Sequence, residues 1–255
     1  MCEEKRWAPT GLMGEKLFEK ILNSLQNGVI NLEGEFVHGS NYTFLTKVKP
    51  ENGEEILAVY KPQKGERILW DFPDNTLAHR ETAAFLVSQS LEWGLVPPTI
   101  YREDGPFGPG SVQLFVEHNP NYHYFTFTEQ DFQLLKPVVL FDLLINNADR
   151  KGSHIIFDEN HHLWLIDHGL CFNVEEKLRT VIWDFAGEPI PDELHSALES
   201  FQDKITGPSQ FLDELSTHLD ADEIFALRQR TASLIKTKFL PYPPDDRRAY
   251  PYPPV

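Results

Sequence analysis

The spacing of apolar and polar residues divides the chain into a strand-rich first part and a helix-rich second part. Apolar positions three and four residues apart predict helices over residues 14–27 and 76–93, each followed by a glycine that ends it. Residues 35–61 read as strands, with two shorter strands at 99–101 and 111–116. The first part therefore combines a sheet with two helices.

From about Phe132 onward the apolar spacing is mainly helical. Predicted helices cover residues 131–147, 191–205, 209–218 and 220–236. Residues 154–167 are the exception and read as a β-hairpin. The order of elements predicts an α+β fold of two lobes, a strand-rich N-lobe over 1–117 and a helical C-lobe over 118–255.

The last residues, 240–255, have the sequence LPYPPDDRRAYPYPPV. Proline at this density excludes a helix or a central strand, so the segment should be extended. Its tyrosine rings would let it pack along the body of the protein.

Composition restricts the partners and the compartment. The 255 residues carry a formal net charge of −16, which argues against a nucleic-acid partner and against stable membrane association. Only Cys2 and Cys171 are present, so a disulfide framework is excluded and a reducing compartment fits better. With a polar N-terminal segment and no apolar run near the roughly 20 residues that span a bilayer, we expect a cytoplasmic protein.

The predicted hairpin brings chemically active side chains together at its open end. Residues 158–161 contain the turn, and a pairing that sets Phe157 opposite Trp164 also sets His154 opposite Asp167. We therefore expect the His154 imidazole and the Asp167 carboxylate to lie side by side.

The loop before the hairpin adds a second carboxylate and two cations, Asp149, Arg150 and Lys151. Phosphoryl transfer needs a metal held by carboxylate or amide ligands and a carboxylate that orients the attacking hydroxyl. Asp149 and Asp167 could supply these two functions, and Gly169 would let the backbone turn sharply after Asp167. For either carboxylate alone, a capping role in an acidic hairpin is the alternative.

The patterns D-R-x-x-x-H at 149–154 and I-D-H-G at 166–169 resemble the catalytic and metal-binding loops of the phosphatidylinositol 3-/4-kinase-related superfamily. The similarity is greatest to its small bacterial members and to type II phosphatidylinositol 4-kinases, and it covers residues 35–190. The resemblance implies a protein-kinase-like fold and ATP as the cofactor. It also implies that residues 149–151 form the catalytic loop and that Asp167 binds Mg²⁺.

His154 departs from the pattern of these kinases, which commonly have Asn at this position as a second metal ligand. Imidazole is a poorer Mg²⁺ ligand than an amide or carboxylate oxygen. His154 could bind the metal with Mn²⁺ in place of Mg²⁺, or it could contact phosphate. Asn146 and Asn147 lie close in sequence and could contribute ligands.

A nucleotide-binding lysine is expected on the segment AVYKP, which resembles the V-A-I-K strand of kinases. Its Lys61 would neutralise the α- and β-phosphates of ATP, although a lysine at a strand end is often only solvated. Glu81, on the predicted helix that follows, would hold Lys61 in an ion pair. The superfamily resemblance favours Glu81 over Glu66.

Further ATP contacts are expected from the turn 39–41 and the strand 113–117. Backbone N–H groups of Ser40 and Asn41 could cradle phosphate, although most such turns only connect strands. The adenine pocket would be formed by Val59, Leu114 and Phe115, with Glu117 at the hinge between the lobes. Core packing explains the apolar positions equally well.

Two further groups of residues have open interpretations. Lys177 and Arg179 follow the metal-binding loop and could bind the substrate or the γ-phosphate, or could be solvated. The histidines near the hairpin raise the alternative of zinc, but their spacing is atypical of zinc sites. His161 and His162 should face solvent in the hairpin turn.

The sequence thus predicts an ATP-dependent phosphotransferase that uses Mg²⁺ or Mn²⁺ and a protein or small-molecule hydroxyl as acceptor. Lipid kinases usually need an exposed apolar or basic interfacial element, and the net charge opposes one. Two alternatives stay open. A nucleotide-binding pseudokinase that acts as a regulatory module is favoured by His154, and a nucleotidyl (AMP) transferase would use the same residues with ATP inverted.

Overall fold

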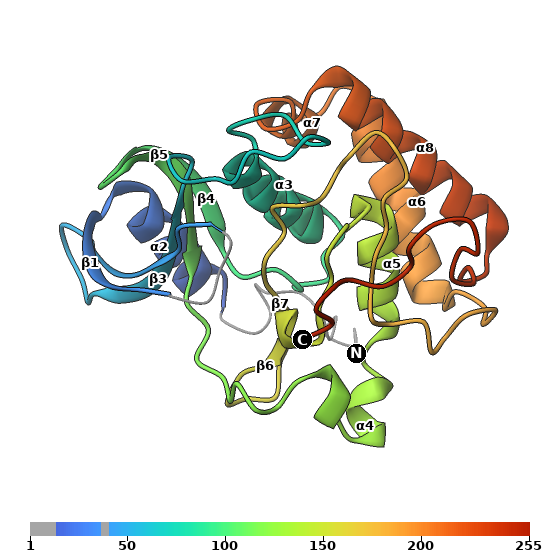
Figure 1. The fold of residues 1–255 in the computed structure, drawn as a ribbon. Helices are drawn as coiled ribbons and strands as arrows, with labels where there is room; N and C mark the ends of the chain where they lie inside the picture. Colours follow the sequence, from blue (N-terminus) through green and yellow to red (C-terminus); the bar gives the residue numbers. More distant parts are fainter. Residues whose placement is uncertain (1–13, 37–40) are drawn as a thin grey trace.

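The computed structural model describes residues 14–36 and 41–255, and its order of elements is that of an α+β protein. A five-stranded antiparallel sheet forms one side of the molecule, in the order β1-β2-β3-β5-β4 (Figure 1). The strands are β1 (Val29–Glu35), β2 (Phe44–Lys49), β3 (Ile56–Pro62), β4 (Thr99–Gly105) and β5 (Gly108–Leu114). Strand β1 precedes the predicted strand region almost entirely, and the other four lie close to their expected positions.

Two helices accompany the sheet, α2 (Glu15–Asn27) and α3 (Leu77–Ser90), and both confirm the predicted positions. Helix α2 buries Phe18, Ile21 and Leu25, which form one apolar face. Helix α3 is buried on almost every side because it lies between the sheet and the helical half (Figure 1). It contacts β4 and β5 on one side and α7 on the other.

The second half is built mainly of helices around one large apolar core. Its elements are α4 (Glu129–Phe132), α5 (Lys136–Ile145), β6 (Ile155–Phe157), β7 (Leu163–Leu165), α6 (Asp192–Thr206), α7 (Gln210–Leu215) and α8 (Ala221–Thr237). The single helix predicted at 131–147 is two helices, because Pro137 lies in the first turn of α5, where its missing N–H costs no hydrogen bond. No helix of the described residues is long and apolar enough to cross a membrane. The boundary between lobes at 117 and 118 stays a prediction.

Strands β6 and β7 form the predicted hairpin, but the register differs by one residue from the expected one. Ile156, and not Phe157, lies opposite Trp164. The Asp158 carboxylate accepts two backbone N–H bonds within the turn and one from the Trp164 indole, so the turn extends to His162. When the pairing of two strands shifts by one residue, each side chain of the shifted strand moves to the other face of the sheet. In this hairpin the bonds that the Asp158 side chain accepts fix the turn, and the turn sets the register.

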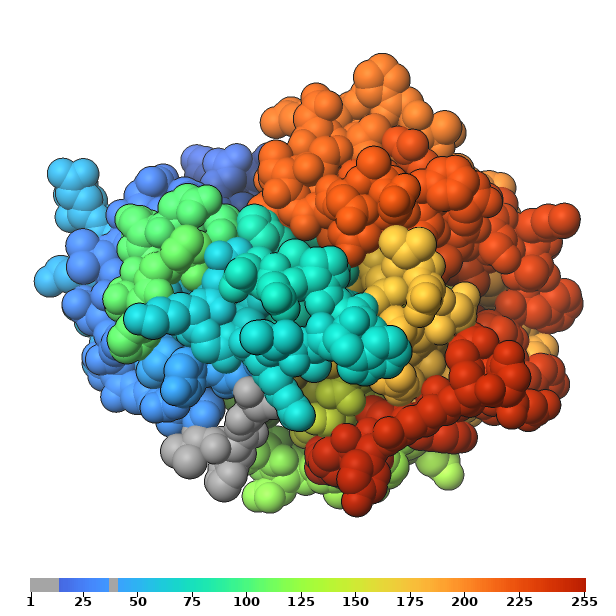
Figure 2. Space-filling view, turned by 45° about the horizontal axis from the view of Figure 1, so that its top comes forward, coloured from blue at the N-terminus to red at the C-terminus, as the bar shows by residue number. Residues whose placement is uncertain are grey.

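The C-terminal tail, residues 240–255, crosses the surface of the helical half in an extended path and ends beside the β6–β7 hairpin (Figure 1, Figure 2). Ala249 is buried, and its carbonyl accepts bonds from the Thr180 backbone N–H at 3.1 Å and the Trp183 indole at 3.2 Å. The segment packs along the body as expected, but not through its tyrosine rings, since Tyr242, Tyr250 and Tyr252 are exposed.

Candidate active site

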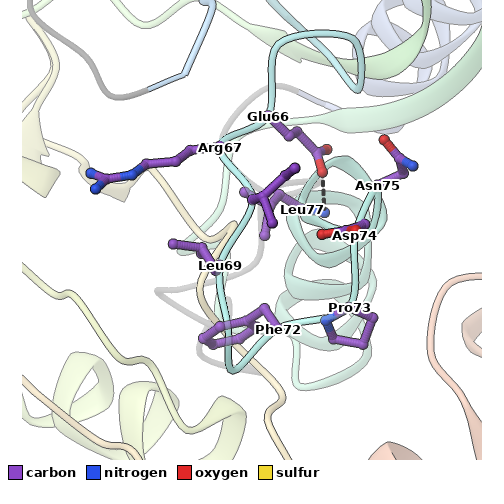
Figure 3. A pocket seen from close by; sticks show the side chains of 9 residues that line it. Glu66, Arg67, Leu69, Phe72, Pro73, Asp74, Asn75 and Leu77 are labelled. Atoms are coloured by element: carbon purple, nitrogen blue, oxygen red, sulfur yellow. Dashed lines mark hydrogen bonds between the residues drawn. The ribbon is translucent and has the colours of Figure 1, made fainter.

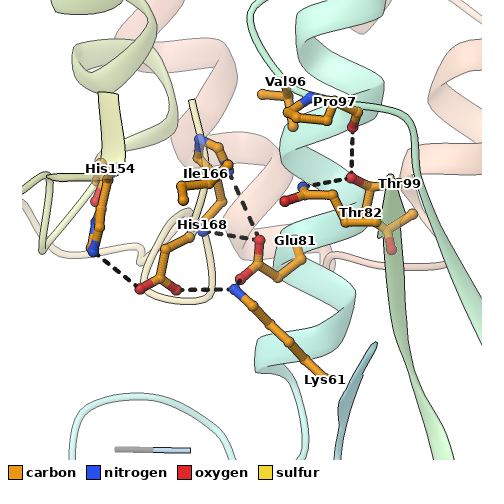
Figure 4. Close-up of polar contacts among 12 residues, drawn as sticks. Lys61, Glu81, Thr82, Val96, Pro97, Thr99, His154, Ile166 and His168 are labelled. Carbon is orange, nitrogen blue, oxygen red and sulfur yellow. Dashed lines mark hydrogen bonds and ion pairs between the residues drawn. The ribbon is translucent and has the colours of Figure 1, made fainter. Parts of the chain in front are cut away.

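A chain of ion pairs connects the sheet, helix α3 and the loop after β7 (Figure 4). Lys61 on β3 forms the expected ion pair with Glu81 on α3, and its Nζ lies 3.2 Å from Asp167 Oδ1. Burial alone would lower the pKa of Lys61, but the carboxylates of Asp167 and Glu81 outweigh burial and hold that pKa above its ordinary value. Lys61 therefore carries its charge throughout the physiological pH range.

Glu81 is fixed at both carboxylate oxygens, since the oxygen that does not contact Lys61 accepts the backbone N–H of His168 at 3.0 Å. Glu66, the other candidate partner, has a different role. Its two oxygens accept bonds from the first two backbone N–H groups of α3, from Leu77 at 3.2 Å (Figure 3) and from Ala78 at 3.0 Å. An acidic group is favourable at this helix end, and Thr76, the expected cap, makes no side-chain capping bond.

Asp167 has a left-handed backbone, with a φ of 62°, and its side chain is 51% exposed. The sharp turn lies at Asp167 itself and not, as expected, at Gly169, which has no positive φ. The register sets Ile166 against His154, since the His154 carbonyl accepts the Ile166 N–H at 3.1 Å. The Lys61 ammonium lowers the pKa of Asp167 well below its ordinary value, so this carboxylate is ionised.

His154 lies beside Asp167 as expected, with its Nε2 3.4 Å from Asp167 Oδ2. Burial lowers the pKa of His154 to about 4, although the Asp167 carboxylate opposes this effect. The imidazole is therefore neutral at pH 7 and able to bind a metal. Its Nδ1 is buried and has no hydrogen-bond partner among the described residues.

An ionised carboxylate and a neutral imidazole that converge on one point fit a divalent cation whose other ligands are phosphate oxygens. In residues 14–36 and 41–255, no three His, Cys, Asp or Glu side chains are arranged to hold a metal by themselves. A site made by Asp167 and His154 would therefore be completed by the nucleotide.

Asp149 lies in the loop before β6, with its side chain 28% exposed and its Oδ2 3.3 Å from Lys151 Nζ. Its backbone N–H donates to the Asn147 side chain at 2.9 Å. Burial raises the pKa of Asp149, the Lys151 ammonium opposes this rise, and the Asp167 carboxylate adds to it. A partly exposed carboxylate with a raised pKa is suited to accept a proton.

Arg150 has no exposed surface, so the expectation that it acts in catalysis is corrected to a positioning role. Its Nε lies 3.0 and 3.1 Å from the two oxygens of Asp142. Nη1 donates to the carbonyls of His154 at 3.3 Å and Ile166 at 2.9 Å. Nη2 donates to His168 Nε2 at 2.8 Å, because a guanidinium has no acceptor. Arg150 thus connects α5, the loop 149–154 and the loop after β7.

Asp142 on α5 is a site residue that the sequence reasoning missed. Its signal was present, since it is the one charged residue in the apolar stretch PVVLFDLLI. Besides Arg150, it accepts a bond from the Asn147 amide at 3.1 Å. The oxygens of Asn146 and Asn147 each accept a backbone N–H bond at 2.9 Å, and both side chains are buried away from the cleft lining, so the arrangement does not support them as metal ligands.

A cleft of about 890 Å³ opens between the sheet and the helical half, a volume suited to a nucleotide. The lining includes these residues that were expected to act in catalysis or to contact ATP or metal: Lys61, Glu81, Val59, Leu114, Phe115, Asn41, Asp149, Lys151, His154 and Asp167. Ser40 lies outside the described residues. Glu117 is exposed and is not part of the lining, where Val116 and His118 lie instead. We therefore assign no nucleotide contact to Glu117.

The two cations that follow the metal-binding loop do not line the cleft. Lys177 lies 3.3 Å from Asp71 and 3.2 Å from Glu175, and its ammonium is 5.2 Å from the centre of the Trp70 ring. The charge of Lys177 is therefore paired inside the protein. The arrangement does not support γ-phosphate binding by Lys177, whereas Arg179 is close enough to Asp149 for its charge to lower the pKa of that carboxyl group.

The histidines near the hairpin take separate positions. His161 is exposed as expected, and its Nε2 lies 2.8 Å from Asp131. His162 is buried because its Nε2 bonds to the Gly94 carbonyl at 2.9 Å. The expectation that His162 faces solvent is wrong, since its ring packs edge-on against Trp164, with 4.4 Å between the ring centres, and turns inward to the Gly94 carbonyl.

Known proteins resemble this chain in sequence and in fold. Residues 74–220 match the family described as phosphatidylinositol 3- and 4-kinase. Protein Rv2133c of Mycobacterium tuberculosis is 38% identical over 264 residues, which cover 90% of this chain and 93% of that protein.

Two solved structures share the fold at low sequence identity. Hydra Fam20 with sugar has a TM-score of 0.52 and 14% identity, and the match covers 88% of this chain and 89% of that one. The Golgi casein kinase has a TM-score of 0.51 and 15% identity, covering 87% of this chain and 74% of that one. The fold is therefore protein-kinase-like, as expected.

Proposed function

The chain belongs to the phosphatidylinositol 3- and 4-kinase family, and on this premise we propose that it is an ATP- and metal-dependent phosphotransferase. The observation that carries the proposal is the convergence of Lys61, Asp149, His154 and Asp167 on one cleft. These residues supply a cation for phosphate, a proton acceptor and two metal ligands.

In this proposal Lys61 neutralises the phosphates of ATP, and Glu81 holds the ammonium toward the cleft through their ion pair. Asp149 orients the acceptor hydroxyl and takes its proton on a carboxylate oxygen. Lys151, 3.3 Å from that carboxylate, places positive charge where the phosphoryl group moves. Arg150 contributes by holding the loop that carries Asp149 and Lys151.

Asp167 and His154 are the residues that would hold the divalent cation. A divalent cation held by these two side chains would neutralise the negative charge of the phosphates during transfer. Asp167 offers an ionised oxygen because Lys61 lowers its pKa. His154 offers a neutral nitrogen because burial lowers its pKa to about 4.

The acceptor in this proposal is a protein or small-molecule hydroxyl in the cytoplasm. The net charge of −16 opposes approach to an anionic lipid surface. The names of the related proteins nevertheless provide two acceptors to compare, phosphatidylinositol and casein. A pseudokinase would bind ATP without transfer, and a nucleotidyl transferase would transfer the AMP group, which carries the α-phosphate, and release pyrophosphate.

We expect ATP with Mg²⁺ or Mn²⁺ to stabilise the protein by about 2.7 kcal/mol at a concentration about 100 times Kd. Thermal unfolding with ATP and each metal, and with a chelator, measures this effect. Incubation with γ- or α-labelled ATP, and with casein, phosphatidylinositol vesicles or no acceptor, then separates the three functions. No shift at millimolar ATP with either metal contradicts the proposal.

His154→Asn is expected to move the metal preference from Mn²⁺ toward Mg²⁺, because an amide oxygen replaces an imidazole nitrogen. The measurement is the ratio of ATP turnover with the two metals. The matched control is His161→Asn, since His161 is exposed and does not line the cleft. An unchanged ratio in His154→Asn would mean that His154 is not a metal ligand, and turnover gained only in the variant would identify the native chain as a pseudokinase.

A further inference from the structure

The C-terminal tail contacts the loop before β6 and the segment 176–183, which follows the loop after β7. Its first anchor is the segment after the metal-binding loop, where the Ala249 carbonyl accepts bonds from Thr180 and Trp183. An ion pair of 3.5 Å between Arg247 and Glu176 lies beside this anchor. The tail is thus fixed before it reaches the cleft.

The second anchor is the catalytic loop itself. The Pro254 carbonyl accepts the backbone N–H of Gly152 at 2.8 Å. Gly152 begins the short 3₁₀ turn Gly152–His154, and the first N–H groups of a helical turn have no partner within it. The tail therefore satisfies a buried donor that the loop cannot satisfy alone.

An aromatic ring also lies against Gly152. A Cβ atom at this position would lie 2.8 Å from Phe125, so the backbone of the loop packs directly on that ring. The Phe125 ring and the Pro254 carbonyl together restrict where Gly152 lies. Asp149 and His154 are in the same loop, so their positions depend on the same two contacts.

Tyr252 and Pro253 line the cleft together with Asp149 and Lys151. The hydrogen bond between Pro254 and Gly152 places them next to the catalytic loop, which is the side that an acceptor hydroxyl must approach. The Tyr252 side chain is 81% exposed, and the Arg248 guanidinium lies 5.6 Å from the centre of its ring. A large apolar ring is thus presented at the mouth of the cleft.

We propose that the tail is a functional part of the active site, in which Pro254 holds the catalytic loop in place and Tyr252 contacts the acceptor. The inference rests on the proposed phosphotransferase function. Pro254 is a positioning residue that acts through Gly152. Tyr252 is a specificity-determining residue that provides a surface for an acceptor larger than water.

Three variants of the full chain test the two roles separately. Deletion of Pro254 and Val255 removes the carbonyl but keeps Tyr252 and the Ala249 anchor. Tyr252→Ala removes the ring but keeps the carbonyl. Tyr242→Ala is the matched control, because Tyr242 is also in the tail and 72% exposed but does not line the cleft.

The deletion should speed amide hydrogen exchange at Gly152 by about tenfold, since one buried hydrogen bond is lost. It should also lower kcat for ATP hydrolysis and leave KM for ATP unchanged. Tyr252→Ala should leave amide hydrogen exchange at Gly152 unchanged. It should lower the fraction of γ-phosphate that is transferred to dephosphorylated casein and raise the fraction that is transferred to water.

If the deletion variant and Tyr252→Ala both behaved like the Tyr242→Ala control in exchange, kcat and partition, the inference would be overturned. The proposed function would still stand. A loss of thermal stability alone, with exchange at Gly152 and the partition unchanged, would also overturn it. A full chain that binds ATP without any turnover would contradict the proposed function instead.

Discussion

Asp149→Asn is expected to lower phosphoryl transfer by about 10²–10⁴-fold, the usual contribution of a general base, while ATP binding stays nearly unchanged. Asp149 acts on the acceptor hydroxyl in our proposal, so its loss raises the free energy of the transition state and leaves the affinity for the nucleotide unchanged. Turnover with γ-labelled ATP and calorimetric binding of ATP with metal measure the two quantities.

Asp167→Asn should show the opposite pattern, because this carboxylate is the proposed metal ligand and pairs with Lys61 at 3.2 Å. ATP binding should weaken together with transfer. Asp203→Asn is the matched control, since Asp203 is an exposed residue on α6 that does not line the cleft. Equal losses of ATP binding in Asp149→Asn and Asp167→Asn would mean that the two roles are wrongly assigned.

The stability of these two variants provides an independent check. The pKa of Asp149 is raised in the folded protein, so its ionised form is disfavoured by folding and Asn should not destabilise the protein at neutral pH. The pKa of Asp167 is lowered by Lys61, so its ionised form adds stability above the ordinary Asp pKa, and that stability is lost as pH falls. At pH 7, Asp167→Asn should therefore unfold more readily than Asp149→Asn.

Much of the site could be predicted from the sequence because its parts lie on regular elements. Lys61 lies near the end of an apolar strand and Glu81 lies on a helix whose position was predicted, and they meet as an ion pair. The contact between His154 and Asp167 was also expected, although for an incomplete reason. The pairing was wrong by one residue, and the left-handed backbone of Asp167 brings the two side chains together.

The remainder depends on contacts between residues far apart in the chain. Nothing in the local pattern shows that Asp142 binds Arg150, or that Pro254 binds Gly152. Buried polar groups nearly always have hydrogen-bond partners, and the tertiary fold determines which partner is near. The role of Arg150 was misjudged for this reason, since a charged residue in a catalytic motif was expected to reach the substrate.

Arg150→Met is expected to destabilise the fold by about 3–5 kcal/mol, because removal of one member of a buried ion pair leaves the other charge unpaired. Burial raises the pKa of Asp142, and the Arg150 guanidinium lowers it. Without the guanidinium, less opposes the effect of burial on the pKa of Asp142. Asp142 must then stay ionised at a high cost in folding free energy or take up a proton. Urea unfolding at pH 7 measures the loss of stability.

The companion variants show whether the buried charge or the loop contacts account for the loss. Arg150→Met combined with Asp142→Leu removes both charges and should recover part of the stability. Recovery should be incomplete, since the bonds from Arg150 to the carbonyls of His154 and Ile166 stay absent. Arg247→Met, which breaks the exposed pair with Glu176, should cost less than about 1 kcal/mol. A residue that holds three segments together cannot be removed without loss of stability. If Arg150→Met lost no more stability to urea than Arg247→Met and lost only phosphoryl transfer, Arg150 would therefore act on the substrate and not through the loops.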